Sequence, residues 1–235
     1  MERKGFDPRT LATIAVMTAL VLLLTSIIRV PTPAKGYAHL GDTGVFFSAF
    51  AFGPWIGAVA GGLGTGLSDL MSPYMQFAPA SLLIHGLEGL VAGLLVRRIR
   101  GLGGFILAAV VGGIIVVTGY FLVEIPMYGV PAAAGEVPAN ILQVIIGALV
   151  AVPLFTAVRQ AYPPITRFAS QSDRSAILVV SLLVCLLGIV AGGVMLARLL
   201  YWHVFVASFD LPLAVAAGLL LVSGLFGILL QTRRR

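Results

Sequence analysis

Long apolar runs make up most of this chain, and short gaps rich in polar residues, Pro or Gly separate them. A helix needs about 20 residues to cross a bilayer, so the runs predict eight membrane-spanning segments. We expect them at Thr10 to Arg29, Asp42 to Gly53, Trp55 to Met71, Ala78 to Val96, Gly103 to Val123, Pro138 to Val158, Ala176 to Leu199 and Val204 to Leu230. The pattern therefore predicts an all-α fold, a polytopic membrane helical bundle.

The second run is short, and it meets the third at Gly53-Pro54, a sequence that breaks a helix. We expect these two runs to form a tight helical hairpin or a partly re-entrant pair, buried against the rest of the protein. Two gaps on the other side of the bundle, Val30 to Gly41 and Glu124 to Val137, are rich in Pro, Gly and Tyr and are predicted to be outer loops.

Lys and Arg residues occur at every second gap between the runs. Four clusters hold most of them: Arg3, Lys4 and Arg9; Arg97, Arg98 and Arg100; Arg159, Arg167 and Arg174; and Arg233, Arg234 and Arg235. Positive charge near span ends is typical of the cytoplasmic side. We therefore expect both termini in the cytoplasm and a multi-pass protein of the cell membrane.

A polar stretch from Tyr162 to Arg174 divides the chain into two parts. We expect a six-span membrane domain at residues 1–160, a cytoplasmic linker at 161–175 and a two-span C-terminal membrane extension at 176–235. The single cysteine, Cys185, lies inside an apolar run, so its expected role is packing rather than a disulfide or a metal site.

Composition excludes several classes of protein. A mean hydropathy of +1.06 with 10% charged residues is too apolar for a soluble domain of 235 residues. The net charge of +6 lies at span ends, where lipid headgroups attract it, so nucleic acid is not an expected partner. The glycines of the third run follow no strand and precede no Gly-Lys-Ser/Thr sequence, so the chain is not expected to carry a nucleotide-driven motor.

Polar and ionisable side chains within the apolar runs are costly in lipid and indicate a functional site. On the fourth run, Ser81, His85 and Glu88 are spaced to share one helical face within two turns. A His and a Glu that only satisfy each other inside the bundle are the structural alternative.

Further polar residues gather at the same predicted depth. Tyr120 and Glu124 lie one turn apart on the fifth run, and Asn140 and Gln143 on the sixth; the outer loops and span ends add His39, Asp42, Tyr74, Gln76 and Tyr128. Two of these have a structural alternative, because Asn140 and Asp42 could each cap a helix. A further acid, Asp69, is expected to tie down the end of the third run. Together the polar residues predict a mostly apolar cavity, open to the outside, that binds a small molecule.

His85 and Glu88 also have a His-x-x-Glu spacing, but no second pair completes a set of metal ligands in the sequence pattern. We therefore expect no metal and no cofactor. On the first run, Ala12, Ala15 and Ala19 form a smooth face that either docks another membrane helix or packs inside the bundle.

Several distinct short motifs lie along the first two thirds of the chain. Among them are Gly41-Asp42, Phe46-Phe47-Ser48-Ala49, Phe52-Gly53-Pro54, Asp69-Leu70, Ala78-Pro79, Gly86-Leu87-Glu88-Gly89 and Gly119-Tyr120-Phe121. With these motifs, residues 10 to 160 resemble the substrate-binding S components of energy-coupling-factor (ECF) vitamin transporters, and among them the riboflavin-type branch. The two spans after residue 175 depart from this resemblance, because such S components usually have six.

The resemblance implies that the six-span domain captures a water-soluble vitamin or precursor outside a bacterial or archaeal cell. It also implies a transmembrane coupling subunit and two cytoplasmic ATPase subunits as partners. In that family an alanine motif on the first span docks the coupling subunit, which corresponds here to Ala15 and Ala19, with Ala12 extending the face. The polar residues named above would then bind the substrate, and the loop after the first span would act as a lid.

The residues favour a flat heteroaromatic substrate, riboflavin or a pyrimidine or pyridine vitamin, because Tyr and Phe stack on rings and Glu, Asn and Gln bond to ring nitrogens and hydroxyls. Two other functions stay open. A stand-alone secondary transporter would need a route for a coupling ion, to which Glu88 and Asp69 could contribute. An intramembrane enzyme with His85 and Glu88 as base and acid lacks a nucleophile, so an enzyme is not expected.

Overall fold

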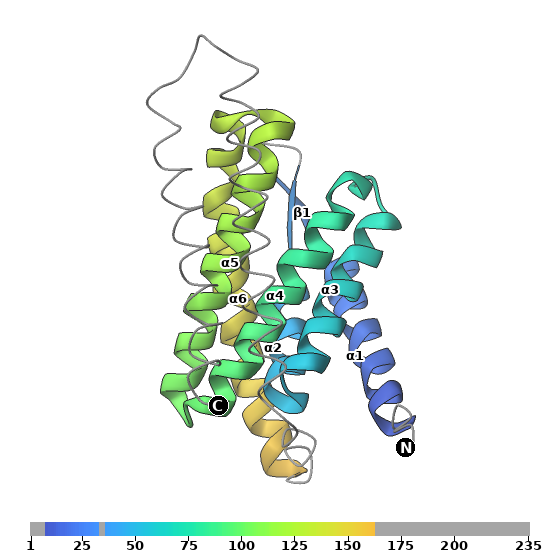
Figure 1. The fold of residues 1–235 in the computed structure, drawn as a ribbon, viewed down its shortest axis with the longest axis vertical. Coiled ribbons are helices and arrows are strands. Elements are labelled where there is room, and N and C mark those ends of the chain that lie inside the picture. The colour runs from blue at the N-terminus through green and yellow to red at the C-terminus, as the bar shows by residue number, and fades with distance from the viewer. Residues whose placement is uncertain (1–7, 33–35, 163–235) are drawn as a thin grey trace, which may run out of the picture. The chain divides into compact units, whose positions relative to one another are not determined.

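The computed structural model describes residues 8–32 and 36–162, and these residues form a bundle of helices (Figure 1). The elements in chain order are α1 (Pro8–Ile27), β1 (Arg29–Pro31), β2 (Tyr37–His39), α2 (Gly41–Phe52), α3 (Pro54–Leu70), the short 3-10 helix η1 (Met75–Phe77), α4 (Ala78–Arg98), α5 (Leu102–Tyr128) and α6 (Val130–Ala161). The predicted all-α polytopic fold is confirmed. The first six predicted spans each correspond to one of these helices.

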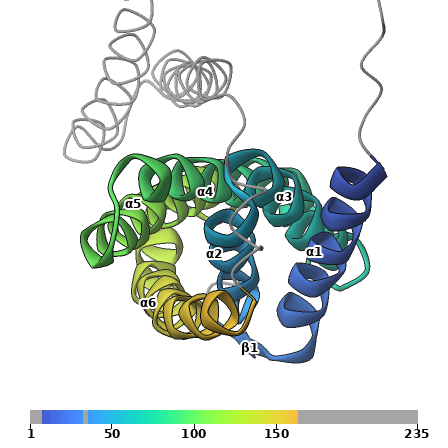
Figure 2. The same ribbon diagram turned by 90° about the horizontal axis from the view of Figure 1, so that it is seen from below.

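Helix α2 lies at the centre of the bundle, with the other helices around it (Figure 2). Every residue of α2 except Phe52 is buried. The helix ends at Gly53, whose φ of 92° is accessible to glycine but costly for other residues, and α3 begins at Pro54, where a proline fits a helix start. The predicted helical hairpin at Gly53-Pro54 is therefore present.

Glycines bring α3 and α4 into close contact. A Cβ atom added to Gly89 would lie 2.3 Å from the carbonyl oxygen of Gly57, and one added to Gly61 would lie 2.6 Å from the carbonyl oxygen of His85. Small residues of this kind let helix backbones approach in lipid. The close packing fixes the position of α4, which carries three of the predicted site residues.

Four of the described helices are long and apolar enough to cross a membrane: α1, α4 together with η1, α5 and α6. Helix α2 has 12 residues, in agreement with the expectation that the second run is short, and α3 has 17. The two predicted C-terminal spans and most of the predicted linker lie outside the described residues. The chain separates into units at residues 1–171 and 172–235, and only the first contains described residues.

The prediction of a loop from Glu124 to Val137 is wrong. Helix α5 continues through Pro126 to Tyr128, and α6 begins at Val130, so Gly129 with a φ of 86° is the single residue between them. Pro131 occupies the start of α6, a position that needs no backbone N–H. The sixth helix therefore begins eight residues before the position predicted for it.

The other predicted loop contains a two-stranded antiparallel ribbon, in which Arg29 pairs with His39 and Pro31 with Tyr37. One residue, Ile28, separates Arg29 from the end of α1, and one residue, Leu40, separates His39 from the start of α2. The Tyr37 ring packs against that of Tyr74, with 4.2 Å between ring centroids. This ribbon brings Tyr37 next to Asp69 of α3, and His39 next to His85 of α4 and Gln143 of α6.

Candidate functional site

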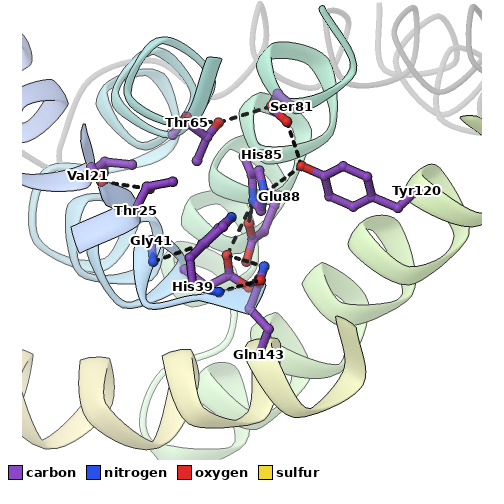
Figure 3. A network of polar contacts seen from close by, with 12 residues as sticks. Val21, Thr25, His39, Gly41, Thr65, Ser81, His85, Glu88, Tyr120 and Gln143 are labelled. Atoms are coloured by element: carbon purple, nitrogen blue, oxygen red, sulfur yellow. Dashed lines mark hydrogen bonds and ion pairs between the residues drawn. The ribbon is translucent and has the colours of Figure 1, made fainter. Parts of the chain in front are cut away.

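The centre of the candidate site is His85, a fully buried residue of α4 (Figure 3). Its Nδ1 atom lies 2.7 Å from the Oε2 of Glu88, one helical turn away, and 3.4 Å from the Oδ1 of Asp42 on α2. Both carboxylates are fully buried. The predicted pairing of His85 with Glu88 is present, and Asp42 adds a second carboxylate from another helix.

A chain of hydroxyl groups continues from His85 toward the ribbon. The Tyr120 hydroxyl lies 3.2 Å from the Nε2 of His85 and 2.7 Å from the Ser81 hydroxyl. Ser81 in turn donates to the carboxylate of Asp69, which also accepts a hydrogen bond from the Tyr37 hydroxyl. Four elements, α3, α4, α5 and β2, are therefore joined by one continuous hydrogen-bond network.

Gln143 of α6 closes the network on the opposite side. Its Nε2 donates to Asp42, and its Oε1 accepts a hydrogen bond from the backbone N–H of His39 at 3.0 Å. The approach of α6 to α2 depends on Gly147, because a Cβ atom there would lie 2.6 Å from the Cβ of Asp42. A side chain at position 147 would separate Gln143 from its partners.

Above this network is a small cavity with a free volume of about 20 Å³, enough for a single water molecule. It is lined by Gly36, Tyr37, His39, Asp69, Phe77, Ser81, Tyr120, Glu124, Glu136, Asn140 and Gln143. The predicted cavity, mostly apolar and open to the outside, is therefore not what this conformation contains. The ribbon residues Tyr37 and His39 are among the lining, and a ligand larger than a water molecule would need this lining to move.

The predicted site residues fall into three groups. Those that line the cavity are His39, Ser81, Tyr120, Glu124, Asn140 and Gln143. Asp42, His85 and Glu88 lie deeper: Asp42 bonds to Gln143 and His85 to Tyr120, both of the lining, and Glu88 bonds to His85. Tyr74, Gln76 and Tyr128 lie near the ribbon and η1, outside the lining; Gln76 is exposed and its Nε2 is 3.4 Å from the Tyr128 hydroxyl.

Neither of the two capping alternatives is correct. Asn140 lies ten residues inside α6, and the residue before α2 is Leu40, which makes no side-chain cap, while the Asp42 carboxylate accepts hydrogen bonds from Gln143. Asp69 does lie at the end of α3, as expected, but its carboxylate faces the cavity and bonds to Tyr37 and Ser81.

Sequence reasoning missed Glu136, Tyr37 and Phe77 as lining residues. Glu136 was assigned to a loop, yet it lies one helical turn before Asn140 and two before Gln143. Extending the sixth helix by one turn would have placed all three on one face. Tyr37 had no comparable signal, because a strand of three residues is too short to show a period.

Carboxylates dominate the electrostatics of the site. Every Asp and Glu that the structure describes belongs to it, and each is at most 3% exposed: Asp42, Asp69, Glu88, Glu124 and Glu136. The nearby cation is Arg29, whose guanidinium donates to the carbonyl oxygen and hydroxyl of Ser68 and lies over the Tyr37 ring. Burial lowers the pKa of His39, and burial with the Asp69 charge raises that of Tyr37, so both side chains are neutral.

The alanine face predicted on the first span lies on the outside of the described bundle. Ala12, Ala15 and Ala19 are all exposed, whereas α1 contacts the bundle through the opposite face with Met17, Val21 and Thr25. An internal packing role is therefore excluded within the described residues.

Comparison with known proteins identifies the family. Residues 5–160 match the model of a family described as the S component of the ECF-type riboflavin transporter. The thiamine precursor transporter HmpT of Lactococcus lactis subsp. cremoris (strain MG1363) is 35% identical over 153 residues, which cover 64% of this chain and 87% of that protein. An uncharacterised protein from the gap 3' region of Pyrococcus woesei is 35% identical over 131 residues, covering 55% and 88%.

The fold agrees with this family. A solved structure, described as the S component of a bacterial ECF transporter, superposes with a TM-score of 0.53 at 23% identity and covers 65% of this chain and 96% of that one. S components are membrane-embedded subunits that bind a vitamin-like substrate and work with a membrane coupling subunit and ATPases. The chain belongs to the ECF-type riboflavin transporter S-component family, the substrate-binding subunits of vitamin transporters.

Proposed function

We propose that this S component captures a flat, basic heterocycle with amino groups, of the thiamine-precursor type, for ATP-driven uptake. The observation that carries the proposal is the placement of the described carboxylates: Asp69, Glu124 and Glu136 line the cavity and Asp42 and Glu88 lie deeper, while the nearby Arg29 bonds to Ser68. Such a lining favours ligands that bring positive charge or hydrogen-bond donors and opposes anionic ones.

Glu124 is the residue most directly available to such a ligand. It is 3% exposed, lines the cavity, and its Oε2 has no hydrogen-bond partner among the described residues. Leaving a buried polar atom unpaired costs about 1–3 kcal/mol, so an amino group or ring N–H that reaches this oxygen gains the corresponding interaction. Asn140 and Glu136 are on the facing helix and offer further acceptors.

The aromatic residues around the cavity suit a single planar ring. Phe77 lies 6.3 Å from the Tyr120 ring and 6.1 Å from the Tyr128 ring, measured between centroids. The cavity holds only about one water molecule, so any ring must displace lining side chains, and a one-ring pyrimidine displaces fewer of them than the three-ring flavin does. The relative HmpT, named as a thiamine precursor transporter, supports the same choice.

Calorimetry on the purified, detergent-solubilised protein tests the proposal. An aminopyrimidine and thiamine should bind more tightly than riboflavin, and an anionic vitamin such as biotin should not bind. Glu124→Gln should weaken aminopyrimidine binding at least tenfold, which corresponds to about 1.4 kcal/mol. Asp173→Asn, a carboxylate change in the predicted linker, is the matched control. Preferential binding of riboflavin or of the anion would overturn the choice of substrate, and no binding across the panel would overturn the function.

We further propose that the exposed face of Ala12, Ala15 and Ala19 docks a transmembrane coupling subunit, which two cytoplasmic ATPases drive. The support is the exposure of all three alanines on a helix whose opposite face is buried. Small residues allow a partner helix to approach closely in lipid.

A further inference from the structure

Beneath the cavity, two imidazoles and two carboxylates converge in a region closed to solvent (Figure 3). One ligand atom from each of His39, Asp42 and His85 lies within 4.8 Å of the other two. Glu88 joins this group because its Oε2 is 2.7 Å from the same His85 nitrogen that Asp42 approaches at 3.4 Å. We propose that these four side chains bind a divalent transition-metal ion such as Zn²⁺.

A second, independent observation points to a missing ligand at this place. The Oε1 atom of Glu88 is fully buried and has no hydrogen-bond partner among the described residues. Buried polar atoms are nearly always satisfied in native proteins, and a carboxylate oxygen left unpaired is among the most costly exceptions. A cation held between His85 and Glu88 would satisfy this oxygen.

The donor set fits a transition metal better than the other cations. Two imidazole nitrogens with carboxylate oxygens are typical ligands of Zn²⁺, Co²⁺ and Ni²⁺, whereas Ca²⁺ and Mg²⁺ prefer oxygen alone. Asp42 and Glu88 together carry two negative charges when ionised. A divalent ion balances both, while a proton on His85 balances only one.

The surrounding hydrogen bonds would orient the ligands. With Nδ1 of His85 on the metal, its Nε2 carries the ring proton and donates to the Tyr120 hydroxyl at 3.2 Å. Gln143 fixes the Asp42 carboxylate through its amide. Such outer partners of metal-binding histidines and carboxylates set their orientation and their basicity.

His39 changes its hydrogen bonding when the ion binds. Its Nδ1 accepts the Gly41 backbone N–H at 3.1 Å, so Nε2 is the nitrogen available to the metal. Coordination through Nε2 moves the ring proton to Nδ1, and the bond to Gly41 is exchanged for the bond to the metal. The ligands then come from β2, α2 and α4, three elements that the ion would hold together.

Metal titration of the full-length protein in detergent, stripped with a chelator and free of vitamin, tests the proposal. Co²⁺ should bind at one ion per chain and give the visible absorption bands of nitrogen and oxygen coordination, and Zn²⁺ should displace it. His39→Gln and Asp42→Asn should each weaken Co²⁺ binding at least tenfold. His203→Gln removes the remaining imidazole of the chain and should leave binding unchanged.

Two results would overturn the proposal: no stoichiometric metal binding by the wild-type protein, or Co²⁺ binding that is unchanged in both His39→Gln and Asp42→Asn. Thermal unfolding of each variant checks that it is folded, and Glu88→Gln, with a changed Co²⁺ spectrum expected, replaces any variant that is not. Vitamin binding is measured separately on the metal-free protein. If the protein binds the aminopyrimidine but no metal, the proposed function stands and this inference is wrong. If it binds the metal but no vitamin of the panel, this inference stands and the proposed function is wrong.

Discussion

Gln143 of α6 donates its side-chain amide to both carboxylate oxygens of Asp42 on α2, at 3.1 and 3.3 Å, across 101 positions of sequence. The same side chain accepts the backbone N–H of His39. A single glutamine therefore joins a peripheral helix, the central helix and the ribbon, and Gln143 and its two partners are all buried.

We expect Gln143→Leu to lower the free energy of unfolding by about 1–3 kcal/mol, because it leaves the His39 N–H and the Asp42 carboxylate without a partner. Thermal unfolding in detergent measures the change. Gln76→Leu is the control, since Gln76 is exposed and a surface substitution usually changes stability by less than about 0.5 kcal/mol. Equal losses in the two variants would show that the bridge contributes nothing.

Gly89→Ala should destabilise the protein by about 1–3 kcal/mol, because its Cβ would meet the carbonyl oxygen of Gly57 at 2.3 Å where α3 and α4 cross. Gly103→Ala places the same methyl group near the start of α5, where no atom lies within 4 Å. That variant should be neutral or slightly more stable. The two unfolding temperatures, compared in one detergent, would contradict the packing argument if they shifted alike.

Glu136→Gln should weaken the binding of a basic aminopyrimidine by roughly tenfold, or about 1.4 kcal/mol, because it removes one negative charge from the cavity lining. The affinity for an uncharged analogue of similar shape should change less. Calorimetry with both ligands separates the two effects. A parallel loss for both would assign Glu136 a structural role and count against charge selection by the lining.

Ala15→Trp should leave ligand binding by the isolated protein unchanged and abolish ATP-driven uptake, because an indole blocks close approach of a partner helix. Vesicle uptake with the coupling module present, together with binding to the purified variant, measures both properties. Val150→Trp places the same side chain on an exposed position of α6 and should permit uptake. Normal uptake by Ala15→Trp would remove the docking assignment.

The sequence predicts a helix boundary correctly where Gly and Pro are adjacent. Gly53-Pro54 predicted the α2–α3 hairpin, because glycine adopts the positive φ and proline starts the next helix. Pro126 and Pro138 instead lie inside α5 and α6, where the sequence predicted a loop and a helix start. A proline within a helix costs about 3 kcal/mol, but a long loop at this depth would leave many backbone groups unpaired, and that cost is larger.

The candidate site was predictable only within single helices. The spacing of Ser81, His85 and Glu88 placed them on one face of α4, and the structure confirms it. The neighbourhood of His39 and Asp42 was not predictable, because it depends on a short ribbon and on the central position of α2. The expectation that no metal binds relied on the lack of a second His-x-x-Glu pair, and donors gathered from β2, α2 and α4 give no such spacing signal.

The ribbon over the cavity is tethered to α1 by a single residue, Ile28, between the helix end at Ile27 and the strand start at Arg29. Arg29 also donates hydrogen bonds to Ser68 near the end of α3. A displacement of α1 would therefore move β1 and, through its pairing with β2, the residues Tyr37 and His39 that line the cavity, and it would have to break the hydrogen bonds between Arg29 and Ser68. The helix with the exposed alanine face is thus joined through one ribbon to the lining of the cavity.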